Sequence, residues 1–322
     1  MQSHPVPMPR DIQEKDLNRD LEVCLDNLLF ADERKAALLS QYRAVQAELA
    51  EKWLDTLLLR SGNARGEELL ELLLISYRTL LDERKVSVTD TNEILLPFCL
   101  SLSEALRRRK ILLLPLLLGM TGHAHDGEDE EKQIGSVSLL PGHMQTQMFE
   151  HMLPKNCRIL SSQSYEECCE NVAGGTTDAC ILPLQDRNGG RLCSFYRLLT
   201  QHGLVIRKKA IWSFEEDDVQ CALACKHPDP TVTRRAPYWI DLLIPCPAGT
   251  PPMPFLLALT ACRVQLESIS SDTDPQTEEI SYYLTLRCDT ESLTQALFLF
   301  ARMQDISFRL TGLYKDTPSK ED

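Results

Sequence analysis

The residues best placed to carry chemistry follow the apolar run ILPL at 181–184. This run predicts a strand, the glycine-containing segment after it predicts a turn, and SFYRLLTQ predicts a helix. In α/β folds, ligands bind beside the carboxyl ends of strands, where such turns lie. The turn holds Gln185 and Asp186 but no evident catalytic group. The pattern therefore predicts the frame of an active site without evident chemistry in it.

Histidines and cysteines could bind a metal, but their placement argues against it. His123 and His125 lie in the flexible acidic tract 121–133, which offers no preorganised site. The twelve cysteines are irregularly spaced, and Cys168 and Cys169 are adjacent, which suits neither a disulfide framework nor a CxxC pair. We expect reduced thiols that fill small apolar sites, with no metal and no other cofactor.

Composition and charge argue against two kinds of partner. The 322-residue chain has a net charge of −13 and no clustered basic face, which argues against binding to nucleic acid. The apolar segment 111–120 is too short to span a membrane and contains Pro115, so we expect a buried helix end there. The first residues are polar, unlike a signal peptide. We therefore expect a cytoplasmic protein.

The N-terminal third of the chain shows helical periodicity. Leucines recur at spacings of three and four between Leu17 and Leu29, and a second helical run extends from about Glu33 to Arg60. Two further helices are expected before the acidic tract. These elements predict a helical bundle or a dimerising helical module.

The period changes after Ile134. Strands alternate with helices, which predicts a mostly parallel sheet. A linker rich in proline and turn formers, 226–237, precedes a segment that reads strand, helix, strand, strand, helix, strand. This is the order of a ferredoxin-like sandwich, so we predict a multidomain α+β protein.

The order of these segments resembles the bifunctional chorismate mutase–prephenate dehydratase proteins of phenylalanine biosynthesis. The resemblance assigns 11–120 to a mutase-like helical module, 121–133 to an acidic linker, 134–226 to a truncated dehydratase-like α/β lobe and 237–316 to an ACT-like domain. Matching framework residues are Pro183, Gly190, Tyr196, Leu198, Leu199, Leu204 and Ile206. Positions where the family carries other polar groups are Thr146, Gln185, Asp186 and Gln220.

The resemblance implies an active site in a cleft between two lobes. The second lobe follows the strand matched by LVIRKKAIW, but here only SFEED precedes VQCALAC, so we predict that this lobe is absent. Prephenate is a dianion, and its dehydration needs a proton donor in a site that excludes water. The nearby VTRR at 232–235 could restore a Thr-Arg pair, but we interpret it as part of the linker.

The helical module resembles chorismate mutase more weakly. The resemblance implies that Arg19, Arg34 and Lys52 bind the dianionic substrate chorismate. Chorismate mutase catalyses the rearrangement of chorismate mainly by electrostatic stabilisation, which such cations provide. Asp55 and Arg60 are further candidates for positions at which the mutase family carries charged residues. The alternative is that all of these are solvated charges on amphipathic helices.

The C-terminal segment resembles the ACT domain that binds phenylalanine in these enzymes. Leu266, Glu267 and Ser268 match the family's effector motif, whereas Ile269 and Ser270 replace its Arg-Pro. ACT domains usually pair edge to edge, which implies a homodimer.

Three functions follow from the resemblance. The first is a regulatory or amino-acid-sensing relative without dehydratase activity. The second is an active chorismate mutase, and the third is a working mutase and dehydratase with a rearranged cleft. The ligand is expected to be chorismate, prephenate or phenylalanine. We rank the first function highest and leave enzymatic activity open.

Overall fold

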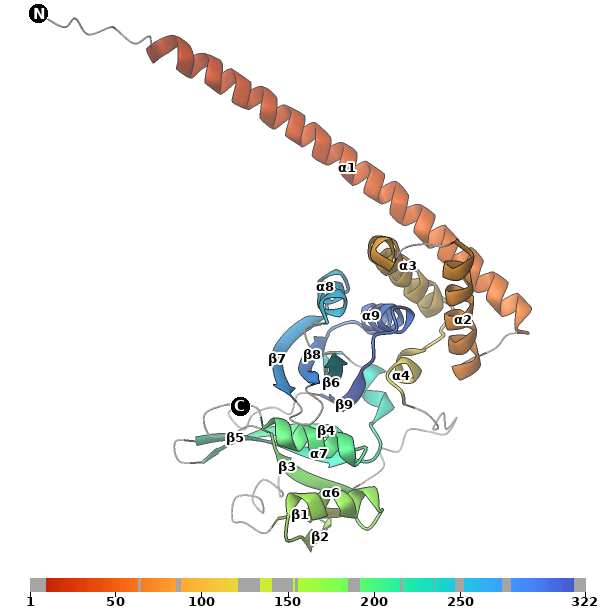
Figure 1. Ribbon diagram of the computed structural model, residues 1–322, viewed down its shortest axis with the longest axis vertical. Coiled ribbons are helices and arrows are strands. Elements are labelled where there is room, and N and C mark those ends of the chain that lie inside the picture. Colours follow the sequence, from red (N-terminus) through yellow and green to blue (C-terminus); the bar gives the residue numbers. More distant parts are fainter. Residues whose placement is uncertain are drawn as a thin grey trace, which may run out of the picture.

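The computed structural model describes residues 10–62, 65–84, 88–120, 134–140, 153, 156–184, 192–214, 217–234, 236–246, 252–273 and 279–315. A long helix projects from a body in which helices and a twisted sheet pack together (Figure 1). The helices are α1 (Arg10–Arg60), α2 (Glu67–Arg84), α3 (Val88–Arg108), α4 (Leu114–Leu117), α6 (Tyr165–Ala173), α7 (Cys193–Gln201), α8 (Met253–Ala261) and α9 (Glu291–Met303). The strands are β1 (Ser136–Leu139), β2 (Arg158–Ser161), β3 (Ala179–Pro183), β4 (Val205–Phe214), β5 (Asp217–Cys225), β6 (Tyr238–Cys246), β7 (Gln265–Thr273), β8 (Ile280–Cys288) and β9 (Arg309–Tyr314).

Helix α1 is continuous, although the sequence predicted two helices over this region. It contains no glycine or proline that would end a helix, and at 1.5 Å per residue its 51 residues span about 75 Å. Among the described side chains of this helix, the buried apolar ones, Ala50, Leu54 and Leu57, lie in its C-terminal part, which packs on the body. Every described side chain from Asp26 to Val45 is exposed.

The described strands form one sheet in the order β2-β1-β3-β5-β4-β9-β6-β8-β7. The prediction of a mostly parallel sheet is wrong for its middle. Strand β5 runs antiparallel to both β3 and β4. Two residues connect β4 to β5, and a connection that short returns the chain antiparallel.

The last six elements have the predicted order of strand, helix, strand, strand, helix, strand. Their strands lie in the order β9-β6-β8-β7, and β9 also pairs with β4 at Gly312 and Ile206. The sheet of the α/β segment therefore continues into that of the C-terminal segment. Helix α7 packs on one face of the joined sheet, because Tyr196 and Leu199 share a core with Tyr283.

The N-terminal helices share a hydrophobic core with the C-terminal segment. Gln295 of α9 accepts a hydrogen bond from the Leu113 backbone N–H at 2.8 Å and donates one to Ser103 at 3.3 Å. Arg302 donates two hydrogen bonds to the Leu117 carbonyl, at 3.2 and 3.0 Å. These buried and half-buried contacts fix α3 and α4 against α9.

Several smaller predictions also have an outcome. The apolar segment 111–120 contains the buried helix α4, as predicted. Eleven of the twelve cysteines have described side chains; these eleven are free thiols, and nine of them are buried. No helix in the described part of the chain combines the length and apolar character needed to cross a membrane. The acidic tract 121–133 lies outside the described residues.

Candidate functional site

The candidate site is the edge formed where β3 ends beside Gln220 and Cys221 of β5. Pro183 pairs with Cys221, and the Leu184 N–H donates a hydrogen bond of 2.7 Å to the Gln220 carbonyl. The structure therefore brings Gln220 beside Leu184, where the described residues after β3 end. The other predicted residues of this site, Gln185 and Asp186 of the predicted turn and Thr146, lie outside the described residues.

The described side chains at this edge offer little acid–base chemistry. Leu184 and Cys221 are buried, and burial raises the pKa of the Cys221 thiol to about 12. A thiol with that pKa is protonated and unreactive at neutral pH. Gln220 carries a neutral amide, which can orient a ligand but cannot supply a proton at neutral pH.

A β-hairpin occupies the position where the resemblance implies a second lobe. Strands β4 and β5 pair along their whole length, from Val205 with Cys225 to Phe214 with Asp217. Only residues 215 and 216 join them. A lobe cannot be inserted into a connection of two residues, so nothing between these strands encloses the edge from the other side.

The VTRR segment does not restore a Thr-Arg pair at this edge. Val232, Thr233 and Arg234 lie in a 3₁₀ helix, η1 (Pro230–Arg234), which precedes β6, and not on a strand as a restored pair would require. The buried Thr233 hydroxyl donates a hydrogen bond of 3.0 Å to the Pro230 carbonyl. Its proton is therefore used within the linker.

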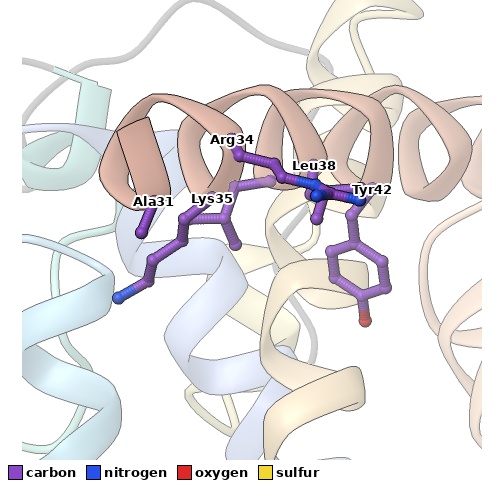
Figure 2. Close-up of a pocket in the computed structure, with 6 residues that line it drawn as sticks. Ala31, Arg34, Lys35, Leu38 and Tyr42 are labelled. Atoms are coloured by element: carbon purple, nitrogen blue, oxygen red, sulfur yellow. The ribbon is translucent and has the colours of Figure 1, made fainter. Parts of the chain in front are cut away.

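The three cations predicted to bind chorismate all lie on α1. Arg34 is exposed and lines a hollow of about 430 Å³ together with Lys35, Leu38 and Tyr42. These side chains lie along one side of the helix (Figure 2). Lys52 is exposed and pairs with Glu48 at 2.5 Å. Arg34 lies about 22 Å from Arg19 and about 27 Å from Lys52 along the helix axis. Within one chain, these cations do not converge on a small dianion.

The predicted effector residues lie on the edge strand β7. Leu266, Glu267 and Ser268 are all exposed. The pairing of β7 with β8 shifts its register between Leu266 and Ser268, so Glu267 occupies a β-bulge. The three residues lie on the edge of the sheet, where the outer side of β7 has no neighbouring strand among the described residues.

Sequence reasoning missed a hollow of about 280 Å³ between α7 and the C-terminal sheet. Arg197 of α7 pairs there with Asp272 of β7, and Arg309 of β9 also lines it. Burial raises the pKa of Tyr283 in its wall. The residues come from elements far apart in sequence, so no local pattern marks them.

A buried ion pair at the join between the two parts of the sheet was also missed. Lys209 of β4 contacts Asp241 of β6, with Nζ 2.7 Å from Oδ2. Asp241 is the one acid in the apolar run YWIDLLIPC, and a buried acid in an apolar strand requires a partner. This acid in an apolar strand could have predicted a buried ion pair from the sequence.

Among the described residues, no three histidine, cysteine, aspartate or glutamate side chains are grouped to hold a metal ion. The histidines of the acidic tract lie outside those residues. Burial raises the pKa of the Cys262 and Cys288 thiols to about 12, so both thiols are protonated at neutral pH.

Comparisons with known proteins concern the fold. No protein-family model matches the chain, and no curated protein matches it in sequence. A solved prephenate dehydratase from Streptococcus mutans is similar with a TM-score of 0.50 and 14% identity, over 57% of this chain and 99% of that chain. This likeness supports a mixed α/β fold resembling prephenate dehydratase.

Two other solved structures are less similar. GqqA, described as a novel type of quorum quenching acylase, has a TM-score of 0.47 and 15% identity over 57% of this chain and 96% of its own. A prephenate dehydratase from Arthrobacter aurescens in complex with L-Phe has a TM-score of 0.45 and 11% identity over 56% of this chain and 90% of its own.

Proposed function

We propose that this protein is a prephenate dehydratase-like protein of aromatic amino acid metabolism that lacks dehydratase activity and acts as a regulatory, amino-acid-sensing homodimer. The fold likeness and the resemblance of the sequence support the relation to the dehydratases. The proposed domains are a helical module at 11–120, an α/β lobe at 134–226 and an ACT-like segment at 237–316.

One observation carries the loss of activity, namely the hairpin of β4 and β5 in place of a second lobe. A dehydrating enzyme must exclude water around a dianion and give a proton to the departing hydroxide. The hairpin leaves no room between β4 and β5 for a wall opposite the edge at Pro183 and Gln220, and the side chains described at this edge are neutral. Within the described residues, this edge therefore provides neither the enclosure nor the proton donor.

The test is an assay of the purified full chain with prephenate, with a bacterial prephenate dehydratase as the positive control. We expect phenylpyruvate to form at the rate of the protein-free solution. Formation well above that rate overturns the proposal. In that case the Gln220→Ala variant shows whether the edge of β3 and β5 carries the reaction.

The sensing role is tested by the effect of phenylalanine on thermal stability. A ligand that binds only the folded protein stabilises it by about 2.7 kcal/mol at a concentration one hundred times its Kd. We expect phenylalanine to raise the Tm, and we expect Glu267→Ala to reduce the rise. No shift at millimolar phenylalanine, together with no heat of binding by calorimetry, contradicts a phenylalanine sensor.

Chorismate mutase activity is the alternative that the helical module leaves open. In a single chain, Arg34 and Lys52 are too far apart along α1 to hold one substrate. The same protein should be assayed with chorismate, because mutase activity does not depend on the missing lobe. Chorismate turnover would move the function to the helices without restoring dehydration.

A further inference from the structure

The hollow of about 280 Å³ between α7 and the C-terminal sheet is built from both parts of the joined sheet and its covering helix. Arg197, Thr200 and Gln201 line it from α7, and their spacing of three and four residues places them on one side of that helix. Ligand pockets usually measure about 300–1,000 Å³. The hollow therefore suits a molecule at the small end of that range.

The pairing of the strands fixes the arrangement of the floor of this hollow. Arg309 of β9 pairs with Leu243 of β6, which pairs in turn with Tyr283 of β8. Two residues further along the strands, Pro245 of β6 pairs with Ser281 of β8. Side chains two residues apart in a strand point to the same face of a sheet, and all five residues line the hollow. The floor therefore combines apolar side chains, two hydroxyl groups and one cation.

Opposite charges lie at the two ends of this floor. Arg309 is exposed, and no carboxylate in the described part of the chain forms an ion pair with it. Glu279, which is also exposed, lies two residues before Ser281 and lines the hollow beyond it. Arg197 and Asp272 pair with each other, so their charges offset. The hollow thus presents a positive end and a negative end, which match a dipolar ligand better than a simple anion or cation.

The separation of these two charges sets the length of the ligand. Two strand spacings divide β9 from β8, and Glu279 lies four residues along the chain from Tyr283, the residue in line with Arg309. At about 4.8 Å per strand spacing and about 3.4 Å per residue, the two backbones are roughly 17 Å apart. An extended peptide spans about 3.5 Å per residue, so a tripeptide covers roughly 10 Å and the two long side chains cover the remainder. A single amino acid, with both charges on one carbon, does not reach both ends.

We propose that this hollow binds a short peptide, of tripeptide length, by its two free ends. Arg309 holds the carboxylate, because a guanidinium group can donate two parallel hydrogen bonds to a carboxylate. Glu279 accepts the ammonium group, and the middle of the peptide lies over Pro245 and Ser281, whose hydroxyl group hydrogen-bonds the peptide backbone. The predicted effector residues at 266–268 do not line the hollow, so this site is separate from the proposed phenylalanine sensor.

The experiment is isothermal titration calorimetry of the full chain with alanyl-leucyl-alanine as the probe. This tripeptide has free ends, and its leucyl side chain can pack on the apolar part of the floor. We expect saturable binding at millimolar peptide or below, and at least tenfold weaker binding both of free leucine and of the same peptide with an acetylated N-terminus and an amidated C-terminus. Absence of saturable binding at millimolar peptide overturns the proposal. A capped peptide that binds equally well contradicts recognition by the free ends, and leucine that binds equally well contradicts the inferred length.

Two variants test where the peptide binds, with circular dichroism to confirm folding. Arg309→Ala and Glu279→Gln should each raise the Kd of the tripeptide at least fivefold, because each removes the charge at one end of the hollow. The matched controls are Lys315→Ala and Asp289→Asn, which remove exposed charges just after β9 and β8, outside the hollow, and should leave the Kd unchanged. A Kd that neither Arg309→Ala nor Glu279→Gln changes would place the peptide elsewhere and refute this site.

The same variants separate this site from the proposed sensing role. Arg309→Ala should leave the rise in Tm caused by phenylalanine unchanged, because Arg309 lies outside the predicted effector residues. Failure of peptide binding and failure of phenylalanine binding are therefore distinguishable in one preparation of the protein.

Discussion

The buried contact between Lys209 and Asp241 joins the α/β part of the sheet to the C-terminal part. Asp241 is 1% exposed and Lys209 is 10% exposed, with Nζ 2.7 Å from Oδ2. Oδ1 accepts hydrogen bonds from the Thr285 hydroxyl at 2.7 Å and the Tyr314 hydroxyl at 3.2 Å. Oδ2 has no aligned hydrogen-bond donor among the described residues, so its contact with the ammonium group is an ion pair.

Lys209→Met removes the cation and leaves a buried carboxylate with only hydrogen-bond donors to stabilise its charge. Removal of one partner of a buried pair typically destabilises a protein by about 3–5 kcal/mol. For a chain of this size, such a loss lowers the Tm on the order of 10 °C. The double variant Lys209→Met with Asp241→Leu should recover most of the loss, because it leaves no charge buried.

The measurement is a urea titration followed by circular dichroism and tryptophan fluorescence. An exposed ion pair in the same chain provides the control. Lys52 and Glu48 are also in contact, at 2.5 Å, but their side chains are 71% and 65% exposed. Such a pair contributes at most about 1 kcal/mol. The reasoning is refuted if Lys209→Met is no more destabilising than Lys52→Met, or if the double variant is as unstable as Lys209→Met.

Three further predictions concern packing and thiol chemistry. A Cβ on Gly312 would lie 2.9 Å from the carboxylate oxygen Oδ2 of the buried Asp241. Gly312→Ala should therefore lower the free energy of unfolding by about 1–3 kcal/mol, measured by urea titration, and an unchanged midpoint contradicts the close packing. Gln295→Leu leaves the buried Leu113 N–H without its acceptor and should lower the free energy of unfolding, measured in the same way, by about 1–3 kcal/mol. A free energy of unfolding equal to that of the wild type argues against this hydrogen bond. Among the eleven cysteines whose side chains are described, Cys157 and Cys193 should react first with iodoacetamide at pH 8, because the other nine are buried. Mass spectrometry that finds Cys221 alkylated as fast would disprove the burial of its thiol.

The order of the C-terminal elements could be predicted because each one is defined by local periodicity. The run YWIDLLIPC predicts a strand wherever it lies, and SLTQALFLFARM predicts a helix. The pairing of Ile206 with Gly312 could not be predicted in this way, since it joins strands about one hundred residues apart. A sequence pattern fixes which residues face the core but not which strand lies beside which.

The leucine spacing in α1 shows a second limit of sequence reasoning. A repeat at three and four residues indicates one apolar face, and it left open whether this face packs within a helical bundle or in a dimerising helical module. The structure places the residues from Asp26 to Val45 in solvent. The same pattern describes a helix that packs within its chain and one that packs on another chain, and only the position of the body distinguishes them.

The residues that carry the resemblance to prephenate dehydratases bear on fold and activity differently. Tyr196, Leu199, Leu204 and Ile206 are all buried, in the core that α7 forms with the sheet. Substitution of large buried side chains typically costs several kcal/mol, so these positions are constrained by packing whether or not a reaction occurs nearby. Agreement there is evidence for the fold alone. Evidence for dehydration must come from polar groups at the edge of β3 and β5. Of the residues that the resemblance assigns to this site, Gln220 is the one whose side chain is described, and it carries a neutral amide. Prephenate turnover abolished by Gln220→Ala would therefore be needed to argue that this edge is still catalytic.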